Sequence, residues 1–304
     1  MEQNATLTKD KKGAINVSTF SQKIHSYLKH PFSLLVWIIT ILAALLTAAS
    51  FVYLVLYILI KGVPYLRPEL FSWTYDSNNV SMLPSIINTF LLTALSLVIS
   101  VPLGIFAAIY MVEYAKKGNR IVKFIRVTAE TLSGIPSIVY GLFGMIFFVG
   151  VLKMQLSLLS GSLTVAIMVL PTIMRTTEEA LLSVPQSYRE GSFGLGAGKL
   201  RTVFRIVLPS AVPGILSGVI LATGRIVGET AALIYTAGTM AKVPNNLFAS
   251  ARTLSVHMYL LSNEGLHTNE AFATAVVLLA FVMLINMLAN FVARRLSAKN
   301  AEND

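Results

Sequence analysis

The chain has 304 residues, of which 55% are hydrophobic and only 12% are charged, with a formal net charge of +10 and no cysteine. A soluble protein usually carries about a quarter of its residues as Asp, Glu, Lys or Arg, so this composition excludes an ordinary soluble domain. The lack of cysteine excludes a disulfide framework and a thiolate metal site. The basic excess could suggest an anionic partner, and the positions of the charges indicate a phospholipid surface.

Six stretches contain no Asp, Glu, Lys or Arg. They are residues 31–60, 77–112, 131–152, 154–174, 206–224 and 271–293. At a rise of about 1.5 Å per residue, each is long enough to cross about 30 Å of hydrocarbon. We therefore predict an all-α polytopic membrane protein with six transmembrane helices. The first stretch is too long for the apolar region of a signal peptide, so we expect it to remain in the mature protein.

Lysine and arginine gather on one side of the predicted spans. Of the 24, eighteen fall in the N-terminal tail, in the connections 113–130 and 175–205 and in the C-terminal tail, whereas five fall on the other side. The positive-inside rule then predicts that both termini are cytoplasmic.

Several predicted spans contain residues that shape helix packing. Prolines occur at positions 102, 136, 171, 209 and 213. Each removes a backbone donor, and a packed bundle with an internal path would supply the freed carbonyl with a partner. The fifth span also contains two small-xxx-small patterns, Gly214–Gly218 and Gly224–Gly228, which we interpret as sites of ordinary close helix packing.

The fifth predicted span continues past residue 224, through Arg225 and Glu229, into the uncharged stretch 230–241. A charge inside a span costs about 2.5 to 3.5 kcal/mol even on the milder insertion scales. The i, i+4 spacing of Arg225 and Glu229 predicts that both side chains share one helix face and neutralise each other. Such a pair could serve packing alone, but apolar residues can often replace a buried pair. We therefore favour a role in substrate binding or gating, and the planar guanidinium of Arg225 suits an oxyanion.

The connection 176–207 is predicted to be cytoplasmic and to contain two short helices. Pro185 suits a first helical turn, and the glycines at 191, 194, 196 and 198 suit a turn between the helices. These glycines are not a phosphate-binding P-loop, because no lysine in the chain precedes serine or threonine. The chain is therefore not expected to be an ATPase by that route.

Seven residues in this connection and at the start of the next predicted span follow a spaced pattern. They are Glu190, Gly191, Ser192, Gly196, Ile206, Leu208 and Pro209. The pattern resembles the EAA loop of ABC importer permeases, with Gly191 and Ser192 replacing the two alanines by other small residues. The resemblance implies that the segment is a coupling helix that docks into a groove of a separate ATPase subunit.

Two further stretches resemble signatures of the permeases of the phosphate-specific Pst importer. They are Leu-Ser-Gly-Ile-Pro-Ser-Ile-Val-Tyr-Gly-Leu-Phe-Gly at 132–144 and Gly-Arg-Ile-Val-Gly-Glu-Thr-Ala-Ala-Leu at 224–233. The order of features is similar to that of the PstA permeases of this family. The resemblance implies a MetI-like ABC transporter type-1 permease fold. The implied substrate path contains Arg225, Glu229, Thr230, Ser133, Gly134, Pro136 and Ser137.

The resemblance also implies a function and its partners. The chain would be the permease subunit of an ATP-driven importer of inorganic phosphate in a prokaryotic inner or plasma membrane. Its partners would be a related PstC-like permease, two PstB-like ATPase subunits and an external PstS-like phosphate-binding protein. The chain itself would bind no cofactor or metal, because ATP and Mg²⁺ belong to the partner ATPase. The expected parts are a tail (1–30), a first span with an external loop (31–80), a permease core (81–295) with its coupling loop (176–207), and a tail (296–304).

Three alternatives remain open. The chain could be a permease of the same superfamily for sulfate, molybdate or phosphonate, a secondary anion transporter, or a membrane scaffold that holds an ATPase without a path.

The longest external connection, 239–268, is expected to contain a short helix at 253–261. His257 and His267 lack partners at metal-ligand spacing and are interpreted as surface or packing residues.

Overall fold

The computed structural model describes residues 31–116 and 118–301, so the predicted N-terminal tail 1–30 lies outside the described residues. Every element in the described ranges is helical, as predicted. The segment up to Tyr57 and the segment from Ile58 onward form two separate compact units. The core lies in the second of these units.

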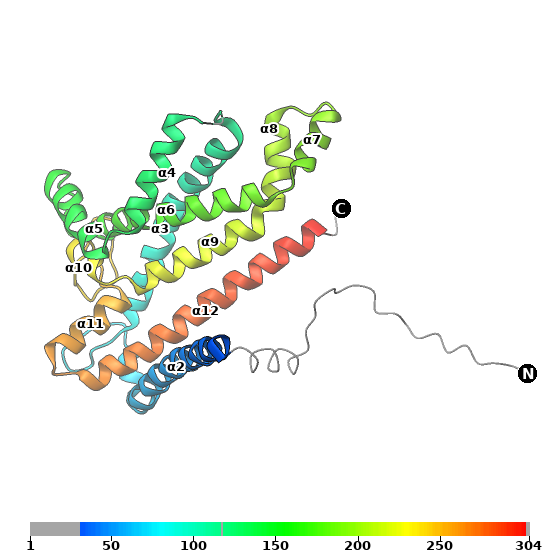
Figure 1. The fold of residues 1–304 in the computed structure, drawn as a ribbon. Helices are drawn as coiled ribbons and strands as arrows, with labels where there is room; N and C mark the ends of the chain where they lie inside the picture. The colour runs from blue at the N-terminus through cyan, green and yellow to red at the C-terminus, as the bar shows by residue number, and fades with distance from the viewer. Residues whose placement is uncertain (1–30, 117, 302–304) are drawn as a thin grey trace, which may run out of the picture. The chain divides into compact units, whose positions relative to one another are not determined.

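Figure 1 shows the elements along the chain. The longer helices are α2 (Pro31–Gly62), α3 (Leu83–Ile109), α4 (Arg120–Ser133), α5 (Ser137–Gly144), α6 (Leu158–Ser183), α7 (Gln186–Gly194), α9 (Leu208–Gly228), α11 (Leu254–Glu264) and α12 (Thr268–Ala301). Short helices are α8 (Lys199–Thr202), α10 (Ala231–Thr236), η1 (Val63–Tyr65) and η2 (Pro68–Phe71), and three π-helical turns are η3 (Tyr110–Tyr114), η4 (Met145–Val151) and η5 (Val203–Val207). The π turns adjoin α3, α5 and α9 without a break, so they lengthen those helices.

Five helices of the described chain are long and apolar enough to cross a membrane. They are Phe32–Tyr65, Leu83–Tyr114, Leu158–Ser183, Lys199–Gly228 and Thr268–Phe291. These correspond to five of the six predicted spans. A sixth span exists only if α4 and the α5–η4 segment count together, and these two bend by 105° relative to each other.

The third predicted span, 131–152, is therefore bent in the structure and is not one straight helix. α4 ends at Ser133, Gly134 forms its C-cap, and α5 begins only at Ser137. Pro136 has no backbone N–H and disfavours a helical conformation in the residue before it, which explains the break. Hydropathy reports the apolar length of a segment and carries no information on a bend inside it.

Two other predicted boundaries differ from the structure. α6 continues past the predicted end at residue 174 to Ser183, and an Arg175–Glu179 pair at i, i+4 spacing lies on this extension. α12 continues to Ala301 through most of the predicted C-terminal tail. The charged residues in these segments end the apolar run without ending the helix.

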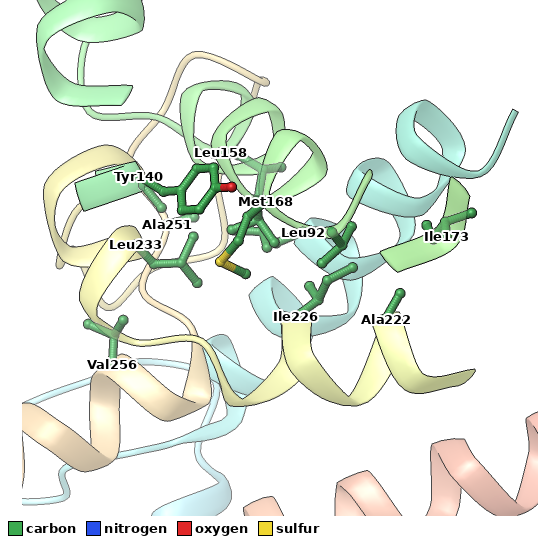
Figure 2. Packing of buried hydrophobic residues seen from close by; sticks show 13 residues of the cluster. Leu92, Tyr140, Leu158, Met168, Ile173, Ala222, Ile226, Leu233, Ala251 and Val256 are labelled. Atoms are coloured by element: carbon green, nitrogen blue, oxygen red, sulfur yellow. The ribbon is translucent and has the colours of Figure 1, made fainter. Parts of the chain in front are cut away.

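The buried core is arranged around α6, which packs against α3, α5, α9 and α10. One apolar cluster includes Leu92 of α3, Met168 of α6 and Ile226 of α9 (Figure 2). A second cluster contains Leu181 and lies where α6 meets the segment leading into α9. A third contains Leu254 and joins α11 to α12. The first two clusters share α6 and α9. The first includes residues of the predicted path region, and the second includes residues of the predicted coupling segment.

Gly214 and Gly218 allow α9 to approach α6 closely. A Cβ atom at Gly214 would lie 2.6 Å from the Cβ of Ala180, and one at Gly218 would lie 2.7 Å from the Cβ of Thr176. Because atoms at these distances overlap, only glycine fits without a shift. The interpretation of close helix packing is confirmed for this pattern. The second pattern, Gly224–Gly228, faces open space within the described chain.

We predict that Gly218→Ala lowers the stability of the isolated chain by about 1 to 3 kcal/mol, because the added methyl group overpacks the contact between α6 and α9. The matched substitution Gly224→Ala should not lower it, since the site is open and alanine favours a helix. Thermal unfolding of both purified variants in detergent measures the difference. Equal melting temperatures for the two variants would contradict this packing.

Candidate functional site

The stretches 132–144 and 224–233 lie against each other in the structure. The backbones of α5 and α10 approach so closely that a Cβ atom at Gly141 would lie 2.8 Å from the Cα of Ala232. Tyr140 of α5 and Leu233 of α10 belong to one buried cluster with Met168 (Figure 2). The two halves of the predicted path, which are about eighty residues apart in sequence, therefore form one region of the fold.

The first helix break carries four of the predicted path residues. Ser133, Gly134 and Pro136 are exposed, and Ser137 is half-buried in the first turn of α5. The hydroxyl of Tyr140 donates a 2.8 Å hydrogen bond to the carbonyl of Leu132, which ties α5 to the last turn of α4. The carbonyl of Leu132 also accepts a 3.1 Å hydrogen bond from the backbone N–H of Ile135, so the Tyr140 bond adds a side-chain link at this helix end.

The second helix break separates Arg225 from Glu229. The prediction that they form a pair on one helix face is wrong, because α9 ends at Gly228 and Glu229 has an extended conformation with a ψ of 130°. None of the ion pairs in the described ranges joins these two residues. Instead, Glu229 Oε1 accepts a 3.0 Å hydrogen bond from the backbone N–H of Ala232. The carboxylate therefore caps α10, while Thr230 beside it is half-buried.

Glu229 and Arg225 have different surroundings. Glu229 is buried, and its carbonyl accepts a hydrogen bond from the hydroxyl of Ser255 on α11. Arg225 is half-buried in the last turn of α9, close enough to Tyr140 for an electrostatic interaction. No carboxylate in the described part of the chain is paired with Arg225. The positive charge of Arg225 can therefore attract an anion, whereas the carboxylate of Glu229 is already hydrogen-bonded to the backbone of α10.

A cavity of about 580 Å³ lies between α4 and α6 and reaches α9 at Leu221. Leu221 precedes Arg225 by four residues, so both side chains lie on one face of α9, one turn apart. Ser133 of the first break also lines the cavity. Leu221 is the α9 residue in the lining, and Arg225 lies one turn beyond it, outside the lining. Sequence reasoning missed the cavity, because its walls come from segments that are not adjacent in sequence.

The cavity wall carries a strong ion pair between two helices. Arg126 Nη2 of α4 lies 2.5 Å from Glu178 Oε1 of α6, and the Glu178 side chain is largely buried. Arg175 and Glu179 form an exposed pair on α6, and Glu130 adds a third carboxylate to the lining. With two arginines and three glutamates, the lining has one more negative than positive charge, which favours release of an anion over its retention.

The predicted coupling residues gather at one end of the larger unit, whereas α11 lies at the other end (Figure 1). Glu190 and Gly191 of α7 are exposed, Ser192 is buried, and Ile206, Leu208 and Pro209 are half-buried where η5 leads into α9. Gly196 has a φ of +82°, in the left-handed region that glycine adopts without strain just after a helix. The structure thus confirms two short helices, α7 and α8, joined at glycines.

The exposed side of α7 and the turn after it is rich in large apolar side chains. Tyr188 is 52% exposed, Phe193 is 46% exposed and Leu195 in the following turn is 91% exposed. Together with the exposed Glu190 they form a surface that combines apolar area with one carboxylate. A surface of this kind is typical of a site where another protein docks.

The predicted short helix at 253–261 is present as α11, and its His257 is completely buried. His257 Nδ1 lies 3.3 Å from Arg252 Nη1, and its ring meets Tyr75 edge to face. Burial and the neighbouring Arg252 lower the pKa of His257 to about 4. Within the described residues no group of His, Cys, Asp and Glu is placed to hold a metal ion. His257 is therefore a packing residue, as interpreted, that requires a neutral ring.

We predict that stability falls as the pH drops below about 6.5, the ordinary pKa of histidine, towards the folded-state value of about 4. The folded state binds fewer protons than the unfolded state in this window, so protonation of His257 favours unfolding. His257→Gln should flatten this part of the profile, and the control His267→Gln, at a half-buried site, should not. Melting temperatures between pH 4 and 7.5 test this, and an unchanged profile in His257→Gln would contradict it.

Comparison with known proteins agrees with this architecture. Residues 100–301 match the family described as binding-protein-dependent transport system inner membrane component. The chain is 34% identical over 282 residues to the probable ABC transporter permease protein YqgI of Bacillus subtilis, covering 86% of this chain and 95% of that protein. It is 35% identical over 205 residues to phosphate transport system permease protein PstA 1 of Mycobacterium tuberculosis, covering 65% of this chain and 66% of that protein.

Solved structures show the same fold. A chain of the MetNI methionine ABC transporter in an inward-facing conformation aligns with a TM-score of 0.55 and 20% identity, covering 71% of this chain and 94% of that one. The predicted MetI-like fold is therefore confirmed.

Proposed function

The chain belongs to the binding-protein-dependent transport system inner membrane components, and from this premise we propose that it moves inorganic phosphate across the membrane. It is the permease subunit of an ABC importer, a multi-pass membrane protein whose ATPase is a separate subunit. The proposal concerns the substrate, the path and the partners.

The observation that carries the phosphate proposal is the position of Arg225. A relative named as a phosphate transport permease supports this substrate, and Arg225 supplies a half-buried guanidinium without a carboxylate partner in the described chain. A guanidinium offers a planar fork of donors that matches the oxygens of phosphate. A single such group attracts the anion and still releases it, as transport requires.

We propose that the path runs from the two helix breaks past Arg225 to the cavity at Leu221. Ser133, Gly134, Pro136 and Ser137 border it at one break, and Glu229 and Thr230 at the other. Glu229 acts by fixing the α9–α10 break beside Arg225, because its carboxylate caps α10. Glu178, Glu179 and Glu130 in the cavity lining then favour release of the anion.

The partners follow from the surfaces of the chain and from the family. We propose that Glu190 and the apolar side chains of α7 dock one of two PstB-like ATPase subunits, which bind ATP and Mg²⁺, and that this chain binds no cofactor. The exposed break between α4 and α5 faces a PstC-like permease, and a PstS-like protein delivers phosphate from outside. Both termini and the coupling segment are then cytoplasmic, in agreement with the distribution of Lys and Arg.

The proposed mechanism is alternating access. Closure of the ATPase pair upon ATP binding moves α7, and α6 and α9 carry this movement to the breaks because they are packed at Gly214 and Gly218. The path opens outward, admits phosphate to Arg225, and later opens to the cavity. Energy enters through the ATPase, so this chain needs no reactive group of its own.

We predict that Arg225→Gln lowers ATP-dependent uptake of labelled phosphate into proteoliposomes by at least about tenfold, the effect of losing roughly 1.4 kcal/mol of interaction with the anion. The ATPase should remain bound in this variant.

Glu190→Ala should also lose uptake, but through loss of the ATPase subunit on purification. Each variant is compared with the wild-type complex of all four kinds of subunit.

The control is Arg120→Gln, which removes an exposed arginine from the first turn of α4, outside the cavity lining. Normal uptake by Arg225→Gln would contradict its role in the path. Wild-type import of sulfate, molybdate or phosphonate in place of phosphate would keep the permease and overturn the substrate. Uptake without any ATPase would indicate a secondary anion transporter, and an ATPase-binding chain that imports no anion would indicate a scaffold.

A further inference from the structure

Arg189 of α7 is buried, although it immediately precedes the exposed Glu190 of the docking surface. Its Nε and Nη2 atoms donate hydrogen bonds of 3.1 and 2.6 Å to Glu113 Oε1, and the two side chains are only 11% and 8% exposed. The sequence pattern that identifies the coupling segment does not include Arg189. The function described so far gives it no role.

The same guanidinium also binds the end of α6. Nη1 donates to the carbonyl of Val184 and Nη2 donates to the carbonyl of Leu181, each at 2.9 Å. Carbonyls in the last turn of a helix have no partner within the helix, and a cation there is favourable. Arg189 therefore satisfies the end of α6 and, through Glu113, contacts η3 at the end of the span formed by α3.

α7 has few other attachments to the membrane helices. Arg189 and Ser192 are the buried residues of this helix, and both are polar. Ser192 shares a 2.8 Å hydrogen bond with Thr202 of α8, which binds α7 to its neighbour within the coupling segment. α7 also packs against α8 and η5, at the start of the Lys199–Gly228 span, and Arg189 is its buried link to the ends of α3 and α6.

A second contact supports the same connection. Lys199 Nζ at the start of α8 lies over the ring of Tyr114, 5.1 Å from its centre, and Tyr114 follows Glu113 on η3. The coupling segment is thus attached twice to the end of the α3 span. Only the contact at Arg189 also reaches α6.

We propose that Arg189 is a positioning residue for energy coupling, which fastens the docking helix α7 to the ends of two membrane spans through Glu113 and the carbonyls of Leu181 and Val184. A movement of α7 is thereby transmitted to α3 and α6 together. The inference rests on the proposed function, because it gives the docking helix a mechanical link to the path. Removing one partner of a buried pair leaves the other charge uncompensated, so the link fails when either side chain is changed.

The experiment measures how much substrate is imported per ATP hydrolysed. The full complex is reconstituted in proteoliposomes with Arg189→Lys, which keeps the charge but cannot make four donor contacts, or with Glu113→Gln, which keeps the shape but loses the charge. The matched control is Arg120→Lys on the exposed first turn of α4. Retention of the ATPase subunits on purification is recorded for every variant.

We expect phosphate imported per ATP to fall by about tenfold in both variants, within the usual range of coupling free energies, with the ATPase subunits retained and the control unchanged. An unchanged ratio in either variant would overturn the proposal. A fall that accompanies loss of the ATPase would also overturn it, because Arg189 would then only maintain the docking surface. If the wild type imports sulfate or molybdate and not phosphate, the substrate proposal fails, and the ratio measured with that anion tests Arg189.

Discussion

Hydrocarbon cannot form hydrogen bonds, and this constraint governs the two helix breaks that border the proposed path. At each break a side chain forms a hydrogen bond with the backbone of a helix end. Tyr140 donates to the carbonyl of Leu132 at the end of α4, and Glu229 accepts from the N–H of Ala232 at the start of α10. α5 and α10, the helices that follow the two breaks, also pack directly against each other at Gly141. Specific hydrogen bonds and packing contacts therefore stabilise the fold at both breaks.

The same constraint explains which predictions succeeded. Uncharged runs located α3, α6, α9 and α12, because only a helix hides its backbone over such a length of hydrocarbon. Small residues located the contact between α9 and α6. The apolar run 131–152 gave no sign of the bend, since its composition is that of a straight span. Pro136, which closely follows Gly134, was the residue that could have signalled the break.

Charged residues were harder to place from sequence. The spacing of Arg225 and Glu229 has a meaning only inside a continuous helix, and the helix ends between them. The pairs that do form, Arg126 with Glu178 and Arg189 with Glu113, join residues on different helices. Their separation in sequence gives no periodic signal, so they emerge only when the helices are packed. The motif residues Glu190 and Gly196 were identifiable because their pattern is local.

The charged residues of the fold are of two kinds, those that have a partner within the chain and those that do not. Carboxylates that are buried and hydrogen-bonded, such as Glu113 and Glu229, stabilise helix ends and are already satisfied. Arg225, in the last turn of α9, has no carboxylate partner in the described chain. A satisfied charge fixes geometry, whereas an unsatisfied one attracts a mobile ion. An anion passing between rigid helix ends would therefore meet its strongest attraction at Arg225, where the surrounding polar groups are committed to the backbone and do not compete for it.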